Sequence, residues 1–288
     1  MSLDTFVQDA WRDHGDDPLG VAGRLRTSTH LIASATDFAP YARLVTHVFG
    51  EHLMQLNPGI DLLESLRELS VFDGSTTAHA PVARAIATLK IVGHDPEALH
   101  GLADEDCVGA LAGASGIYTA LNDMALASQS LQGALAAVHP QWSASSPAHR
   151  ALAVAGNNLA AALEEKASST DAERTAMLMA AQTGLTYWKL AGTWLEEERA
   201  EYQLTRCLLR AGDAATALAS AQRCLDVCQR NDAPAFELFF ANAVLALACR
   251  ASGDSVAFAA HRDAALQHYG RVPDDEKTWC SREFGELG

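Results

Sequence analysis

The chain has 288 residues, of which 49% are apolar and 20% are charged, so it can bury a substantial core, and this excludes a disordered tail or a small disulfide-held domain. Its formal net charge of −15 repels nucleic-acid phosphates and anionic membrane surfaces, so we expect neither as a partner. The first residues lack the basic and apolar pattern of a secretory signal, and no stretch reaches the ~20 apolar residues that span a bilayer, so we expect a cytoplasmic protein.

The composition predicts an all-α protein, because alanine and leucine dominate and no segment alternates apolar and polar residues. Four dipeptides read as a helix cap followed by a first-turn proline, namely Asp17-Pro18, Asn57-Pro58, Asp95-Pro96 and Ser146-Pro147. Gly212-Asp213 and Gly253-Asp254 read as the end of one helix and the cap of the next. Between these marks we expect about fourteen or fifteen helices, joined by short turns into antiparallel pairs.

The helix pairs repeat. The segment 200–230 aligns with 241–269 when Gly212 is placed on Gly253, at an offset of 41 residues. A weaker copy covers 113–138 with Asn122-Asp123 at the turn, another covers 156–185 with a longer turn, and 41–69 has a similar form in a vaguer register. A repeating helix pair predicts a solenoid instead of a bundle.

Within these copies, particular positions carry a family resemblance. Leu204 and Leu208 occupy large apolar positions of a first helix, and Ala217 and Cys224 occupy small positions of a second helix where close crossing leaves no room for bulk. The copy at 113–138 fills the corresponding places with Tyr118, Ala127, Leu131 and Ala134. The chain therefore resembles tetratricopeptide-repeat proteins, although Glu201, Thr205, Ala221, Phe258 and Arg262 depart from that pattern and the offset exceeds the usual ~34 residues.

The resemblance implies a right-handed superhelical solenoid of antiparallel helix pairs, about seven pairs in all. Residues 1–105 are expected to form divergent N-terminal pairs, and residues 106–288 the clearer repeats, in one continuous solenoid. The terminal segments 3–34 and 273–287 are expected to cap its apolar ends.

The acidic and aromatic stretch at 187–205 reads as a joint between two helices. Thr193 and Glu196 form a capping-box pattern, and Glu197 and Glu198 fall in the first turn, where the helix dipole favours acids. This explanation requires no pKa shift. Tyr187, Trp188 and Trp194 are expected to fill the wedge between neighbouring pairs.

One face of the following helix carries Arg199, Tyr202, Arg206 and Arg210 at intervals of three or four. The resemblance places first helices on the concave groove, which implies that this row binds a peptide carboxylate, an acidic segment or a phosphorylated ligand. Asn157 and Asn158 on the preceding first helix are expected to add contacts to a peptide backbone. The alternative is a solvated face whose arginines pair with nearby acids.

The sequence offers little sign of a catalytic or metal site. Six scattered cysteines without a CxxC pair read as reduced, small apolar side chains, and Glu97 and His100 lack the second motif that a di-iron site needs. Nucleophile-elbow, phosphate-loop and dinucleotide motifs are missing. We expect neither metal nor cofactor, and a non-enzymatic adaptor that binds a protein or peptide. The alternatives are a ligand-responsive regulatory module acting on a partner protein, and an enzyme with an unrecognised site.

Overall fold

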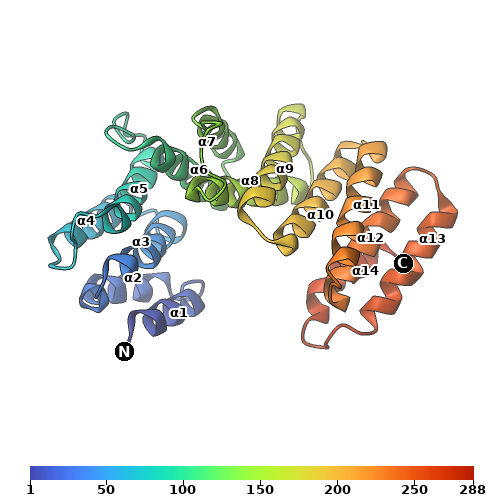
Figure 1. The fold of residues 1–288 in the computed structure, drawn as a ribbon, viewed down its shortest axis with the longest axis horizontal. Coiled ribbons are helices and arrows are strands. Elements are labelled where there is room, and N and C mark those ends of the chain that lie inside the picture. The colour runs from blue at the N-terminus through green and yellow to red at the C-terminus, as the bar shows by residue number, and fades with distance from the viewer. The chain divides into compact units, whose positions relative to one another are not determined.

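The computed structural model describes residues 1–288 and contains fourteen α-helices, one π-helix, short 3₁₀ turns and no β-strand, which confirms the all-α class (Figure 1). The chain forms two compact units, Met1–Trp142 and Ser143–Gly288. The boundary predicted at 105/106 lies inside the first unit, in the first turn of a helix. None of the helices combines the length and the apolar composition that crossing a membrane requires.

The first unit is centred on a buried helix. Its elements are α1 (Leu3–Asp13), α2 (Pro18–Thr27), α3 (Phe38–Thr46), the π-helix η3 (His47–His52), α4 (Leu56–Ser65), α5 (Thr76–Val92), α6 (Asp104–Ala120) and α7 (Met124–Ala136). Helices α3, α4 and α6 all pack against α5, and α6 pairs with α7. Helix α5 is apolar on nearly every side, and it can therefore be surrounded by other helices in this way.

The second unit consists of consecutive helix pairs. Its elements are α8 (Pro147–Glu165), α9 (Asp171–Ala191), α10 (Trp194–Ala211), α11 (Ala214–Arg230), α12 (Ala235–Ala251), α13 (Ser255–Tyr269), the 3₁₀ turn η5 (Lys277–Cys280) and α14 (Ser281–Glu286). Helix α8 packs on α9, α10 on α11 and α12 on α13. Helix α10 also packs against α8 and α12, so the first helices of the three pairs lie side by side (Figure 1).

The C-terminal segment folds back onto the last pair. Val272, Cys280 and Leu287 are buried in one cluster with Phe239 of α12 and Ala265 of α13. The segment thereby covers apolar surface of α12 and α13, the role expected for residues 273–287. Helix α14 packs on α12, which brings its acidic residues close to the first helices of the unit.

Two of the four predicted cap-and-proline pairs are confirmed, a third lies at a helix start without capping it, and the fourth is wrong. The side chains of Asp17 and Ser146 cap α2 and α8. Helix α4 begins one residue before Asn57-Pro58, so the asparagine lies inside the helix and is not its cap. No α-helix starts at Asp95-Pro96, where the carboxylate accepts a hydrogen bond from the Glu97 N–H at 2.9 Å and closes a turn. An Asx turn uses the same side chain as a helix cap, so the dipeptide alone does not separate them.

The predicted helix ends in the second unit are confirmed. Gly212 and Gly253 have φ of 83° and 82°, the left-handed region that glycine adopts without steric cost, and each is followed by a capping aspartate. Thr193 and Glu196 form the expected capping box at the start of α10. The second helix of the joint at 187–205 therefore begins where the sequence predicts it.

Helices α8 and α9 approach closely at two glycines. A Cβ at Gly156 would lie 2.7 Å from the Ala180 carbonyl oxygen and 2.7 Å from the Gly184 nitrogen. Met177, two turns before Gly184 on α9, is buried as well. A Cβ at Gly184 would lie 3.1 Å from the Asn157 nitrogen, a tighter contact than usual, so the close crossing depends chiefly on Gly156.

Candidate functional site

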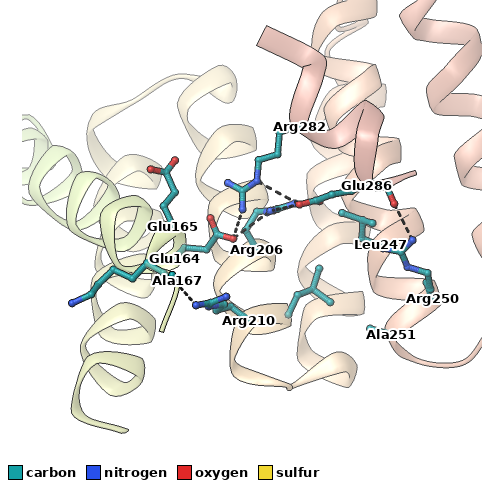
Figure 2. A pocket seen from close by; sticks show the side chains of 12 residues that line it. Glu164, Glu165, Ala167, Arg206, Arg210, Leu247, Arg250, Ala251, Arg282 and Glu286 are labelled. Atoms are coloured by element: carbon teal, nitrogen blue, oxygen red, sulfur yellow. Dashed lines mark hydrogen bonds and ion pairs between the residues drawn. The ribbon is translucent and has the colours of Figure 1, made fainter. Parts of the chain in front are cut away.

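A cavity of about 770 Å³ opens on the side of the second unit where α8, α10, α12 and α14 meet. Its charged lining consists mainly of Glu164, Arg206, Arg210, Arg250, Arg282 and Glu286 (Figure 2). Helices α8, α10 and α12 contribute these side chains from the last two turns of each helix, and α14 contributes Arg282 and Glu286 from its short length. Because the first helices of three pairs lie side by side, residues distant in sequence converge here.

Arg206 holds the cavity wall together. Its guanidinium donates to Glu286 of α14, with one contact at 3.0 Å, and to Glu164 of α8 at 3.3 Å. Arg282 donates to the same Glu164 oxygen at 2.6 Å. The side chains of Arg206 and Glu164 are each only 7% exposed, so this pair is held in a low-dielectric environment. Arg206 is therefore occupied by the protein's own carboxylates.

Two cations in the cavity have no carboxylate partner. Arg210 donates to the backbone carbonyl of Lys166, and Arg250 donates to the backbone carbonyl of Glu286 at 2.9 Å. Neither residue makes a salt bridge, whereas Lys166 pairs with Glu173. A guanidinium has five N–H donors, so both arginines keep donors available and an uncompensated charge. These are the groups with which the cavity can bind an anion.

The remaining members of the predicted row face other partners. Arg199 donates to Glu237 of α12 at 2.6 Å. Tyr202 donates its hydroxyl to Glu283 of α14, and burial raises the pKa of Tyr202 well above its usual value. Neither residue lines the cavity. The row is thus a seam that joins α10 to α12 and α14, and only Arg206 and Arg210 of its four members reach the cavity.

The predicted amide contacts lie apart from this site. Asn157 is half-buried at the crossing with Gly184, and Asn158 is exposed. Neither lines the cavity. Conversely, Arg250 and Arg282 are cavity residues that the sequence reasoning did not name. The 41-residue offset relates Arg210 to Ala251, the immediate neighbour of Arg250. The repeat alignment could therefore have indicated Arg250 as a cavity residue, but not Arg282.

A buried glutamate, Glu198, lies near the N-terminal end of α10. The expectation that the glutamates of this joint need no pKa shift is therefore wrong for Glu198. Glu198 is 1% exposed, and burial raises its pKa to about 8, with the nearby Glu237 carboxylate adding to the effect. Its Oε1 accepts a hydrogen bond from Cys224 Sγ at 3.1 Å, while Oε2 accepts none. Because its pKa lies above 7, Glu198 is mostly protonated at pH 7.

Glu201, one turn later, is buried yet ionised. Burial acts to raise its pKa, but hydrogen bonds from Arg223 at 3.0 Å, Ser220 at 2.6 Å and Lys189 at 3.1 Å outweigh burial and lower it. The contrast with Glu198 comes from partners, since both side chains are almost completely inaccessible. Glu201 of α10 therefore joins its helix to α9 through Lys189 and to α11 through Ser220 and Arg223.

The cysteines do not form a ligand set. All six are free thiols, and burial raises the pKa of Cys224 well above its usual value, which opposes the thiolate that metal binding requires. A group of histidines in the first unit is the one cluster that offers converging metal ligands. No family model matches the chain, and no curated protein sequence matches it either.

Proposed function

We propose that the protein is a non-enzymatic binding module whose second unit recognises an acidic segment of a partner protein or peptide in the cavity between α8, α10, α12 and α14. The observation that carries this proposal is that two cations without carboxylate partners, Arg210 and Arg250, line the same cavity. Guanidinium groups bind carboxylates bidentately, and partial burial strengthens such bonds.

The cavity supports a macromolecular segment better than a small metabolite. It is open to solvent and bordered by the ends of several helices, and it has few apolar side chains to surround a small molecule. A chain segment carrying two carboxylates can reach both arginines while its backbone remains in solvent. Binding through the first helices is also what the tetratricopeptide resemblance implies, within a right-handed superhelix of about seven pairs.

The proposal assigns different roles within the predicted row. Arg206 already binds Glu286 and Glu164, so it positions α14 and shapes the wall. Arg210 and Arg250 make the contacts with the ligand. The same face of α10 already binds two carboxylates of the protein itself, because Tyr202 donates to Glu283 and Arg206 donates to Glu286 of α14.

Charge reversal at the two free arginines tests the proposal. The Arg210→Glu/Arg250→Glu variant should bind an Asp- and Glu-rich fluorescent peptide about 100-fold more weakly than the wild type, because two charge-assisted contacts worth about 1.5 kcal/mol or more each are lost. Fluorescence anisotropy measures the affinity. Wild-type affinity should also fall as salt is raised, since solvent-exposed charges are screened.

Arg230→Glu is the matched control, because Arg230 lies exposed in the last turn of α11 just as Arg210 and Arg250 lie in the last turns of α10 and α12. The substitution places an acid at the C-terminal end of a helix dipole as the double variant does, but Arg230 does not line the cavity. Its affinity should remain within about threefold of the wild type. Equal losses in the control and the double variant, or no loss in either, would refute the proposal.

A further inference from the structure

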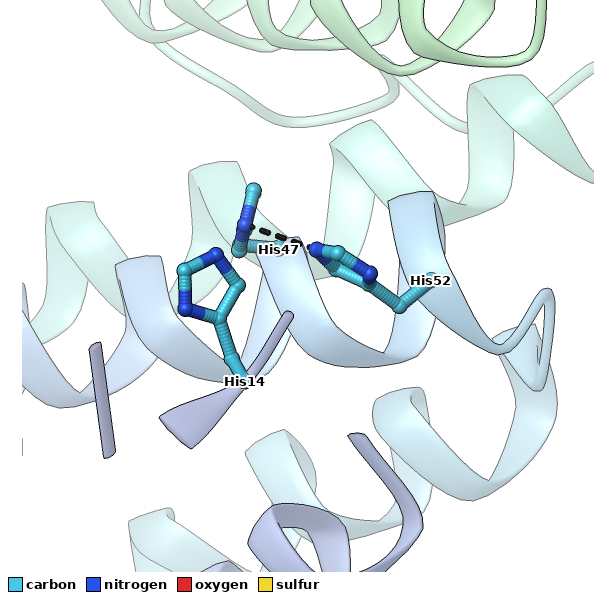
Figure 3. Close-up of side chains that lie close together, drawn as sticks. All are labelled: His14, His47 and His52. Atoms are coloured by element: carbon cyan, nitrogen blue, oxygen red, sulfur yellow. Dashed lines mark hydrogen bonds between the residues drawn. The ribbon is translucent and has the colours of Figure 1, made fainter. Parts of the chain in front are cut away.

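Three histidine rings meet in the first unit, far from the charged cavity in sequence. His14 directly follows α1, while His47 and His52 are the first and last residues of the π-helix η3. The ring centroids lie 4.8 Å apart for His14 and His47, 4.8 Å for His47 and His52, and 5.0 Å for His14 and His52. Figure 3 shows the rings facing a common centre, and their ligand nitrogens all lie within 4.8 Å of one another.

The π-helix is what brings two of these rings together. In an α-helix of 3.6 residues per turn, residues five apart point about 140° away from each other. A π-helical turn with i→i+5 hydrogen bonds places them on one face instead, and such turns are frequent at functional sites. The Leu53 N–H bonds to the Val48 carbonyl at 3.1 Å in this pattern. The rare local conformation therefore has a definite consequence, the alignment of His47 with His52.

Hydrogen bonds fix the direction of the nitrogen lone pairs. His14 Nδ1 lies 2.6 Å from the Trp11 carbonyl oxygen, and His47 Nδ1 lies 2.9 Å from a Glu51 carboxylate oxygen. Both acceptors require a proton on Nδ1, which leaves the Nε2 atoms of His14 and His47 as lone-pair donors. A carboxylate or carbonyl behind a histidine is the usual outer partner of a metal-binding imidazole.

The spacing agrees with coordination to one ion. Tetrahedral zinc binds imidazole nitrogen at about 2.1 Å, which puts two bound nitrogens roughly 3.4 Å apart and their ring centres roughly 5 Å apart. The Nε2 atoms of His47 and His52 are joined by a hydrogen bond of 3.1 Å, which a bound ion would replace (Figure 3). All three centroid distances are close to the roughly 5 Å expected for rings that share one ion. Interplanar angles of 61° to 87° keep the rings from blocking one another.

We propose that His14, His47 and His52 bind a divalent transition-metal ion, with zinc best suited, through their Nε2 atoms. Three neutral imidazoles suit zinc, copper or nickel and do not suit magnesium or calcium. His52 is exposed, so solvent reaches the cluster, and water or an external ligand would complete the coordination of the ion. The ion joins the end of α1 to η3. The site lies in the first unit, and its existence does not depend on the proposed function of the second unit.

Zinc titration of the full-length protein tests the site. Isothermal titration with zinc chloride should give one site per chain, and His47→Ala/His52→Ala should weaken it by about 100-fold or more, because two of three protein ligands are lost. His100→Ala, which removes a histidine whose side chain is 84% exposed elsewhere in the same unit, should change affinity by less than about threefold. In the cobalt-loaded wild type, the strong visible absorption of tetrahedral Co²⁺ should appear.

Glu51→Gln separates ligation from folding, because it leaves all three rings in place. Loss of the carboxylate behind His47 should weaken zinc binding about 10-fold to 100-fold with an unchanged circular dichroism spectrum. Equal zinc affinity in the wild type and in His47→Ala/His52→Ala would overturn the proposal. So would an equal loss in His100→Ala, or a wild type that binds no zinc at micromolar concentrations.

Discussion

Replacing Glu198 with glutamine should make the protein markedly more stable at alkaline pH and leave its stability near pH 4.5 almost unchanged. The pKa of Glu198 is about 8 in the folded protein, against about 4.5 when unfolded, because burial disfavours the charged form. The favourable neutral state is fully present below pH 4.5 and is lost as pH rises through 8. Ionisation should therefore cost the wild type about 3 to 5 kcal/mol by pH 9, a cost that the glutamine variant avoids.

Urea unfolding at several pH values between 4.5 and 9 measures this effect. The difference in unfolding free energy between Glu198→Gln and the wild type should grow between pH 4.5 and about 8 and then level off, since other titrating groups contribute equally to both proteins. Glu197→Gln is the control, because this neighbouring glutamate is half-buried and can be solvated. If the two variants showed the same pH dependence as the wild type, the buried Glu198 would have to be ionised at neutral pH.

Replacing Arg206 with methionine should destabilise the second unit by about 3 kcal/mol, because a buried carboxylate loses one of its two cationic partners. Glu164 would keep only Arg282, and Glu286 would lose its two-contact partner. Methionine retains the apolar stem of the arginine, so the change mainly removes charge. The loss should be concentrated at α14, which Arg206 holds to α10.

Hydrogen exchange of the α14 amides, together with urea unfolding, measures the consequence. Arg206→Met should accelerate amide exchange in α14. Arg210→Met should leave the exchange rates of α14 unchanged and the free energy of unfolding within about 0.5 kcal/mol of the wild type, since Arg210 is exposed. A similar stability for the two variants would contradict the assignment of Arg206 as the residue that holds α14 and Arg210 as a residue free to bind a ligand.

Local signals in the sequence were sufficient to predict much of the fold. Gly212, Gly253 and Thr193 act through the backbone of their own turn, so their effect is readable from a few residues. The proline pair at Asp95 failed because an Asx turn satisfies the same carboxylate without a following helix. The π-helix at His47 was also not predicted, because it depends on packing against the rest of the unit and has no short sequence pattern.

The candidate site was predicted only in part, for a physical reason. The spacing of Arg199, Tyr202, Arg206 and Arg210 correctly placed them on one face of α10. Their partners Glu237, Glu283, Glu286 and Glu164 lie 38 to 81 residues away, and only tertiary packing brings them close. Which arginines remain free of carboxylates is therefore a property of the folded unit. The raised pKa of Glu198 has the same origin, since its sequence position indicates an ordinary first-turn acid.

The most direct test of acidic-segment binding is a map of where the segment binds. Backbone amide chemical shifts of the isotope-labelled protein should be recorded while an Asp- and Glu-rich peptide is added. The largest changes should appear at Arg210, Leu247 and Arg250, around the cavity lined by α10 and α12. Changes confined to the second helices α9, α11 and α13, or no changes at saturating peptide, would contradict the assignment of the cavity as the binding site.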